Sequence, residues 1–238
     1  TSTPYHWARK RSSFTLYVGN NVDGAWSGYL RTAMAEWNQG DTVHLAETGG
    51  ATTAQDCQPS SGTVQVCAGS YGTEVGWLGL ARLYFNPRGT HIVAATVQMN
   101  NSFLYGTDSR YNSDAARRHT MCHELGHAIG LDHVDTASCM NDHQSAVFNN
   151  VSPLTSDFSL LHAMYEHEDA NRTLDLTSDD GLSFFDPTFT TADSGGWDDT
   201  ETVIAESLDD GATMLTFVTW AGDESLAEMV GDPASGGP

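Results

Sequence analysis

The chain has 238 residues, enough to bury a full hydrophobic core in one principal domain with room for an appendage. Its formal net charge of -21 argues against nucleic acids and anionic membranes as partners, because a negative surface repels phosphate groups. No apolar run approaches the length of a bilayer span and no signal peptide opens the chain, so we expect a mature or trimmed form.

The first elements along the chain predict a βαβ unit. Residues 13 to 22 are rich in β-branched and aromatic residues, as in a strand, and residues 42 to 47 predict a second strand. Residues 24 to 39 lie between them and carry an apolar stripe at helical spacing. The stripe consists of Trp26, Leu30, Ala33, Met34 and Trp37. This order favours a right-handed crossover and a parallel strand pair.

The next segment is expected to be irregular and closed by a disulfide. Residues 48 to 76 are rich in Gly, Ser and Thr, which predicts loops with a short hairpin. The four cysteines allow three pairings, and we predict that Cys57 pairs with Cys67 across a turn-rich loop. Residues 80 to 86 and 91 to 100 then predict two strands around the turn sequence PRGT.

The segment MCHELGHAIGLDH contains the main candidate site. We expect its helix to begin near Asp114, whose side chain would cap it, and to run to Gly130. Residues four apart lie on one helix face, so the ring nitrogens of His123 and His127 can meet on one metal ion. Glu124 lies beside this pair and is placed to handle a water molecule.

Gly130 and His133 complete the motif. Gly130 is expected to turn the chain back in a left-handed conformation, which brings His133 round as a third ligand. In the pattern H-E-x-x-H-x-x-G-x-x-H, the three histidines would occupy three of the four coordination positions of a zinc ion. The fourth stays open for water, as a catalytic site requires. Zinc lowers the pKa of its bound water toward about 7, and Glu124 would take the proton as general base.

The C-terminal part predicts one more helix and a hairpin. Residues 152 to 169 predict a helix with a capping Ser or Thr, and we interpret its His162 and His167 as surface residues because they do not share a face. Acidic residues accumulate afterwards, so we divide the chain into a catalytic domain, 1 to 169, and an acidic extension, 170 to 238. In the extension, TVIAES and ATMLTFVTW flank LDDG, which predicts a β-hairpin.

HELGHAIGLDH together with Met140 resembles the metzincin zinc endopeptidases, and GHAIGLDH is closest to the matrixins. In that clan a methionine turn lies under the zinc ligands, and Met140 in ASCMND matches it. Cys122 before the first histidine and Cys139 before the methionine are similar to cysteines of secreted actinobacterial matrixin-like proteins. We predict that these two cysteines pair, which would tie the motif helix to the segment beneath the metal.

This resemblance implies a fold and an activity. The fold is α/β (α+β): a twisted, mixed, mainly parallel sheet with an antiparallel edge strand, two long helices above and a C-terminal helix below the zinc cleft. The activity is that of a secreted, extracellular zinc endopeptidase, expected as a monomer, which acts on a polypeptide and not on nucleic acid or membrane. By resemblance, residues 92 to 98 form the edge strand that binds an extended peptide, and residues 141 to 155 shape the leaving-group pocket.

Two other interpretations stay open. In a gluzincin-like site, Glu166 or Glu168 would replace His133 as third ligand. Alternatively, the chain is a non-catalytic zinc-containing binding module whose acidic C-terminal region binds a partner or calcium. A structural Ca²⁺ is compatible with the many aspartates, but the sequence contains no D-x-D-x-D-G loop.

Overall fold

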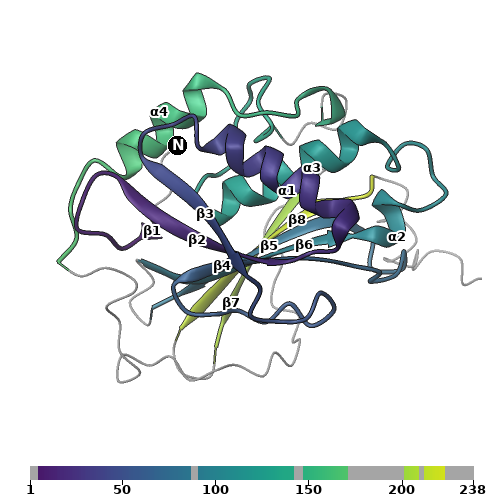
Figure 1. Cartoon of the computed structure of the whole chain (residues 1–238), viewed down its shortest axis with the longest axis horizontal. Coiled ribbons are helices and arrows are strands. Elements are labelled where there is room, and N and C mark those ends of the chain that lie inside the picture. The colour runs from purple at the N-terminus through teal and green to yellow at the C-terminus, as the bar shows by residue number, and fades with distance from the viewer. Residues whose placement is uncertain (1–4, 87–90, 142–146, 171–200, 209–211, 223–238) are drawn as a thin grey trace, which may run out of the picture.

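The computed structural model describes residues 5–86, 91–141, 147–170, 201–208 and 212–222. They form a mixed α/β structure built on one 8-stranded sheet, with the helices on one side of it (Figure 1). The strand order is β3-β2-β4-β6-β5-β8-β7, and β1 pairs with β6 outside this path. In the part of the chain that is described, no helix has the length and apolar character needed to cross a membrane.

The elements have the following bounds. The strands are β1 (His6–Trp7), β2 (Phe14–Asn21), β3 (Val43–Gly49), β4 (Thr63–Gly69), β5 (Trp77–Phe85), β6 (His91–Asn100), β7 (Glu201–Ser207) and β8 (Thr213–Trp220). The helices are α1 (Gly24–Trp37), α2 (Asn101–Leu104), α3 (Asp114–Ala128) and α4 (Thr155–Met164), with a short 3-10 turn at Val147–Asn149.

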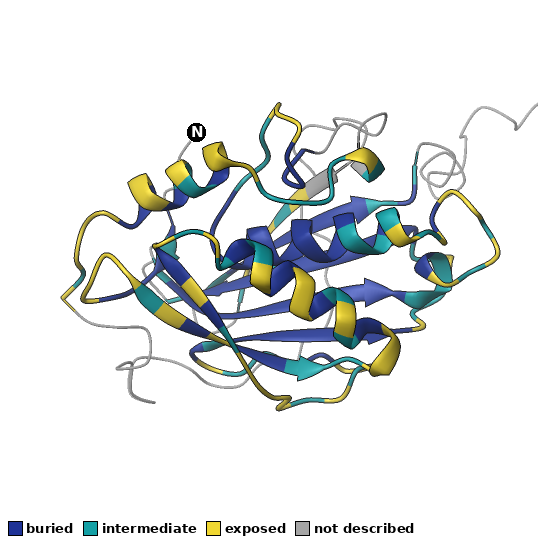
Figure 2. Cartoon of the chain, turned by 45° about the horizontal axis from the view of Figure 1, so that its top comes forward, coloured by how far each residue is buried: buried dark blue, intermediate teal, exposed yellow. Residues whose placement is uncertain are grey.

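The predicted βαβ unit is present. Strands β2 and β3 pair in parallel, and α1 connects them. The carboxylate of Asp23 accepts hydrogen bonds from the backbone N–H groups of Ala25 and Trp26 and so caps α1. All five residues of the predicted apolar stripe are buried. Figure 2 shows α1 with this buried side toward the sheet and an exposed outer side.

Strand β4 replaces part of the segment predicted as loops and a hairpin, so that prediction was wrong. It pairs in parallel with β2 on one side and β6 on the other, and most of its residues are buried. Gln65 is buried there because its side chain accepts hydrogen bonds from Asn21 and from the backbone N–H of Ala51. The predicted Cys57–Cys67 disulfide joins the preceding loop to this strand.

The position of β6 corrects the expected edge strand. Residues 92 to 98 lie inside the sheet, because β6 pairs in parallel with β4 and antiparallel with β5. The antiparallel strand β5 is not an edge either, since its other side pairs with β8. A continuous run of buried residues along β6 agrees with an interior position.

The predicted C-terminal hairpin is present, although its turn lies outside the described residues. Strands β7 and β8 pair antiparallel, and β8 continues the main sheet next to β5. The hairpin therefore belongs to the same sheet as the strands before residue 100, while residues 171–200 of the acidic extension lie outside the described part.

Two helix boundaries differ from the predicted ones. The cap of α3 is Ser113, whose hydroxyl accepts from the N–H of Ala116, whereas Asp114 is the first helical residue. Helix α4 is shorter than predicted, and no Ser or Thr side chain caps it. Instead, the carboxylate of Asp157 accepts from the backbone N–H of Leu154 at 2.7 Å.

Candidate metal centre

Three histidine rings converge at the C-terminal end of α3. Because His123 and His127 lie one turn apart on its buried face, their Nε2 atoms are 2.9 Å apart. The Nε2 of His133 lies 3.1 Å from that of His127. In a tetrahedral zinc site with bonds of about 2.0 to 2.1 Å, ligand nitrogens lie about 3.3 Å apart, so this spacing suits one shared ion.

The outer nitrogens of two rings fix their tautomers. The Nδ1 of His123 is 2.7 Å from the carbonyl oxygen of Cys139, and the Nδ1 of His127 is 2.9 Å from that of Leu131. A carbonyl oxygen only accepts hydrogen bonds, so each Nδ1 carries the hydrogen and each Nε2 keeps its lone pair. Such second contacts orient histidine ligands in metal sites, and the donor set present therefore fits zinc.

A turn after α3 brings His133 into this group. Gly130 has a φ of 105°, a conformation that side chains other than glycine's rarely adopt. The chain then reverses, and the N–H of Leu131 donates to the carbonyl oxygen of Gly126. The hydroxyl of Tyr165 donates to the carbonyl oxygen of Ile129 at 2.9 Å, and burial raises the pKa of this tyrosine far above its ordinary value.

Met140 packs against α3 from the segment that follows His133. It is fully buried, and a Cβ added to Gly126 would collide with its sulfur atom and with the ring of Trp37. The absence of a side chain at Gly126 thus permits this close approach. The Cys122–Cys139 disulfide, as predicted, ties the same segment to α3.

Ser138 and Asp157 support the methionine segment, a role that the sequence analysis missed. The hydroxyl of Ser138 donates to the carboxylate of Asp157 and accepts from the backbone N–H of Met140. Both polar residues are fully buried. The signal was weak, because an Asp in the first turn of a helix is ordinarily read as a cap alone.

Glu124 is fully buried beside the histidines. The hydroxyl of Thr219 in β8 donates to its Oε1 at 2.6 Å. On the β5 side, a Cβ on Gly79 would lie 2.5 Å from the same oxygen, so the glycine gives the carboxylate its space. Strands β5 and β8 thus both contact the predicted general base.

Phe217, two residues before Thr219, faces the same side of the sheet. Its ring stacks on that of His127 with the centroids 4.1 Å apart and the planes 12° apart. The sequence predicts the hairpin but gives no reason to assign its residues to the site. No local signal could have done so, because nearly 90 residues separate the two rings along the chain.

The structure therefore brings His123, His127 and His133 together with their ligand atoms within 4.8 Å of one another. Glu166 and Glu168, the ligands of the gluzincin-like alternative, are not members of this group. His133 is the most accessible of the three, with 18% of its side chain exposed.

Comparison with known proteins finds likenesses among solved structures. No protein-family model matches the chain, and no curated protein matches it. Among solved structures, the chain is similar to the archaemetzincin of Archaeoglobus fulgidus, crystallised in complex with malonate. The likeness has 15% sequence identity and a TM-score of 0.35, and it covers 62% of this chain and 99% of that chain.

Proposed function

We propose that the chain is a secreted zinc-dependent endopeptidase in which His123, His127 and His133 hold the ion. The observation that carries the proposal is the convergence of three Nε2 atoms, two of them with fixed tautomers, beside a buried glutamate. Two disulfides are compatible with an oxidising, extracellular setting.

A zinc ion bound at this site would polarise the scissile carbonyl group and lower the pKa of a water molecule. Glu124 would take a proton from that water and later deliver it to the leaving amine. In this structure Glu124 is buried among α3, β5 and β8, where the hydroxyl of Thr219 donates to its carboxylate and Gly79 leaves it space. Met140 and the Cys122–Cys139 disulfide would keep the histidines in place from below.

The proposal predicts zinc-dependent cleavage of an unstructured protein such as casein. Activity is measured with and without a zinc chelator, and Glu124→Gln serves as the matched variant because the side chains have nearly the same shape. Loss of activity in both controls is expected, with zinc still bound to the three α3 histidines of the variant. An active Glu124→Gln variant would reject the assigned base.

His133→Ala separates this site from the gluzincin-like alternative. Removal of one of three protein ligands should weaken zinc binding by at least about 100-fold, because only two histidine ligands remain. Competition with a chromophoric chelator measures the affinity. Unchanged zinc affinity in this variant would mean that another residue supplies the third ligand.

A further inference from the structure

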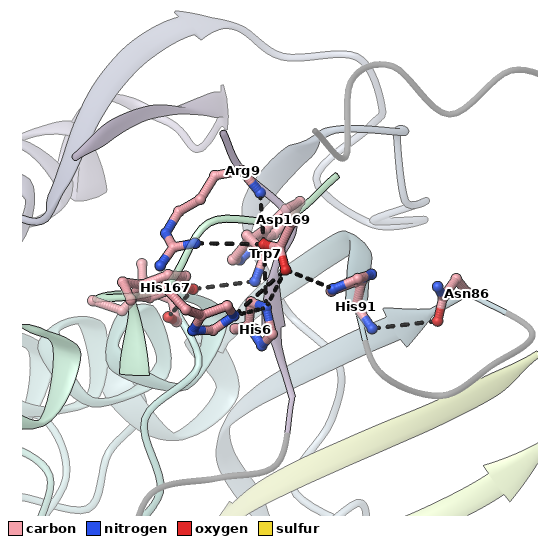
Figure 3. Close-up of polar contacts among 9 residues, drawn as sticks. His6, Trp7, Arg9, Asn86, His91, His167 and Asp169 are labelled. Carbon is pink, nitrogen blue, oxygen red and sulfur yellow. Dashed lines mark hydrogen bonds and ion pairs between the residues drawn. The ribbon is translucent and has the colours of Figure 1, made fainter. Parts of the chain in front are cut away.

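A second group of histidine and carboxylate side chains lies outside the α3 site, where β1, the start of β6 and the segment after α4 meet. His6 in β1, His91 at the start of β6, and His167 and Asp169 after α4 point toward one another (Figure 3). The Oδ1 of Asp169 is 3.3 Å from the Nε2 of His6, 3.3 Å from that of His91 and 3.4 Å from that of His167. The Nε2 atoms of His6 and His167 are 3.0 Å apart.

The Nε2 atoms of His6 and His167 are close enough either to share one hydrogen or to bind one cation. If one Nε2 carries a hydrogen, it donates to the other; if neither does, both lone pairs and the Asp169 carboxylate face one position. A cation between the rings would then be bound by both lone pairs and by the carboxylate. The distances of 3.0 to 3.4 Å match those within the α3 histidine group and the roughly 3.3 Å between ligands of a tetrahedral zinc ion.

Arg9 orients the carboxylate of Asp169. Its backbone N–H donates to Oδ2 at 3.0 Å, and its guanidinium group lies 3.4 Å from the same oxygen. These contacts fix the carboxylate with Oδ1 within 3.4 Å of all three histidines, and Oδ2 is also 3.3 Å from the Nε2 of His6. Orienting contacts of this kind are a regular part of metal sites.

We propose that His6, His167 and Asp169 bind a second divalent transition-metal ion, of which zinc is the expected example. Two imidazole nitrogens and a carboxylate oxygen form a donor set that suits zinc. Calcium and magnesium bind it less well, because they take mainly oxygen ligands. The ion would cross-link β1 to the segment after α4, so its role is structural, and His91 would orient the Asp169 carboxylate from 3.3 Å.

The ion would hold together three segments that are distant in sequence. It would link β1 directly to the segment after α4, and the start of β6 would join them through the contact between His91 and Asp169. Between His6 and Arg9, the backbone N–H of Trp7 donates to the hydroxyl of Tyr165, and the indole N–H of Trp7 donates to the carbonyl oxygen of Ala128. The ion would therefore stabilise the β1 segment that contacts the C-terminal end of α3.

Metal content tests this proposal directly. The untagged full chain is dialysed against a zinc buffer and its zinc is measured by mass spectrometry. Two equivalents are expected in the wild type and in His162→Ala, an exposed histidine on α4 that serves as the control. One equivalent is expected in His6→Ala/His167→Ala, with circular dichroism to verify folding.

The α3 site is then removed to isolate the second one. His123→Ala/His127→Ala should retain one equivalent of zinc, and zinc should raise its thermal midpoint. The same protein with His6→Ala and His167→Ala added should retain none and show no shift. If the wild type binds only one equivalent of zinc, and the α3 substitutions abolish it, the proposal is overturned. The cluster is then held together by hydrogen bonds alone.

A different observation, the position of β8, carries a second inference. An extended peptide binds by adding a strand to a free sheet edge, and β5 would provide that edge beside the α3 histidines. In the structure β8 already occupies it, with Ala81 opposite Phe217 and Gly79 opposite Thr219. Phe217 then covers a ligand ring and Thr219 binds the general base.

We infer that the β7–β8 hairpin is an autoinhibitory segment that occupies the substrate position, an inference that rests on the proposed peptidase function. The resident strand would have to leave β5, by displacement or by cleavage, before a polypeptide could reach Glu124. This accounts for a glutamate with no exposed surface at a site meant for a large substrate.

A reversible cross-link tests this inference. Arg82 and Thr216 are opposite each other in β5 and β8, and alternation places them on the face away from Phe217. The disulfide in Arg82→Cys/Thr216→Cys should reduce casein cleavage, and also the affinity for a peptide hydroxamate, by at least about tenfold relative to Thr216→Cys alone. Reduction should restore both, with the wild type treated identically as the control for its native disulfides.

Phe217→Ala gives the opposite perturbation. The loss of its stacking on His127 should loosen the hairpin and increase both cleavage and hydroxamate affinity. Cross-linked protein that cleaves casein and binds the hydroxamate as well as the single variant would refute autoinhibition while leaving the peptidase intact. Zinc-loaded Phe217→Ala that neither cleaves nor binds would instead reject the peptidase function.

Discussion

The two disulfides offer a matched experiment on the metal centre. They close loops of similar length, with sequence separations of 10 for Cys57–Cys67 and 17 for Cys122–Cys139. In the chain-entropy model these lengths correspond to about 2.7 and about 3.1 kcal/mol of stabilisation. Replacement of either pair by alanine should therefore lower the free energy of unfolding of the zinc-free protein by nearly the same amount.

Zinc affinity should nevertheless distinguish the two variants. The carbonyl group of Cys139 holds the Nδ1 of His123 at 2.7 Å, and the disulfide to Cys122 fixes the segment that carries this carbonyl. Loss of an orienting contact to a ligand weakens metal binding by about 10- to 100-fold. We expect at least a tenfold loss in Cys122→Ala/Cys139→Ala and less than a twofold loss in Cys57→Ala/Cys67→Ala.

Urea unfolding in the presence of a chelator measures the stability of each variant, and competition with a chromophoric chelator measures its zinc affinity. The matched loss of stability removes global unfolding as an explanation for a difference in affinity. Equal zinc affinities in the two variants would refute the idea that this disulfide positions His123.

Three further substitutions test the packing around α3. Gly130→Ala should cost about 1 to 3 kcal/mol, since alanine is strained at a φ of 105°; an unchanged thermal midpoint would contradict this. Gly126→Ala should cost about 1 to 3 kcal/mol in urea unfolding because the new methyl group collides with Met140, and a neutral result would show that the methionine moves freely. Trp7→Phe leaves the buried carbonyl of Ala128 without its 2.8 Å donor, so calorimetry should show a loss of about 1 to 3 kcal/mol, whereas no loss would mean that this bond contributes little.

Features set by local geometry could be predicted from the sequence. The four-residue spacing of His123 and His127 places both rings on one helix face in any α-helix, and the apolar stripe of α1 specifies its buried side. The turn sequence in the C-terminal region likewise predicted two antiparallel strands, because a hairpin pairs neighbouring segments.

Features that depend on long-range contacts could not be predicted from the sequence. Strand β4 is flanked by glycine and serine and contains a glutamine, and only the partners of Gln65 in other segments make its burial favourable. The pairing of β8 with β5 has no signature in either strand, since both merely have strand-like composition. His6 and Asp169 are 163 residues apart, and no spacing rule connects them.

Strand β5 has a further consequence for the protein in solution. Its sequence WLGLARLYF is almost entirely buried, and without β8 its unpaired backbone groups would face outward along an apolar edge. Such an edge is a template for pairing with another chain, and natural proteins avoid exposing one. Release of the hairpin would therefore make the molecule prone to self-association at the same edge, so the form that is open to other polypeptides is also the form that is hardest to keep monomeric.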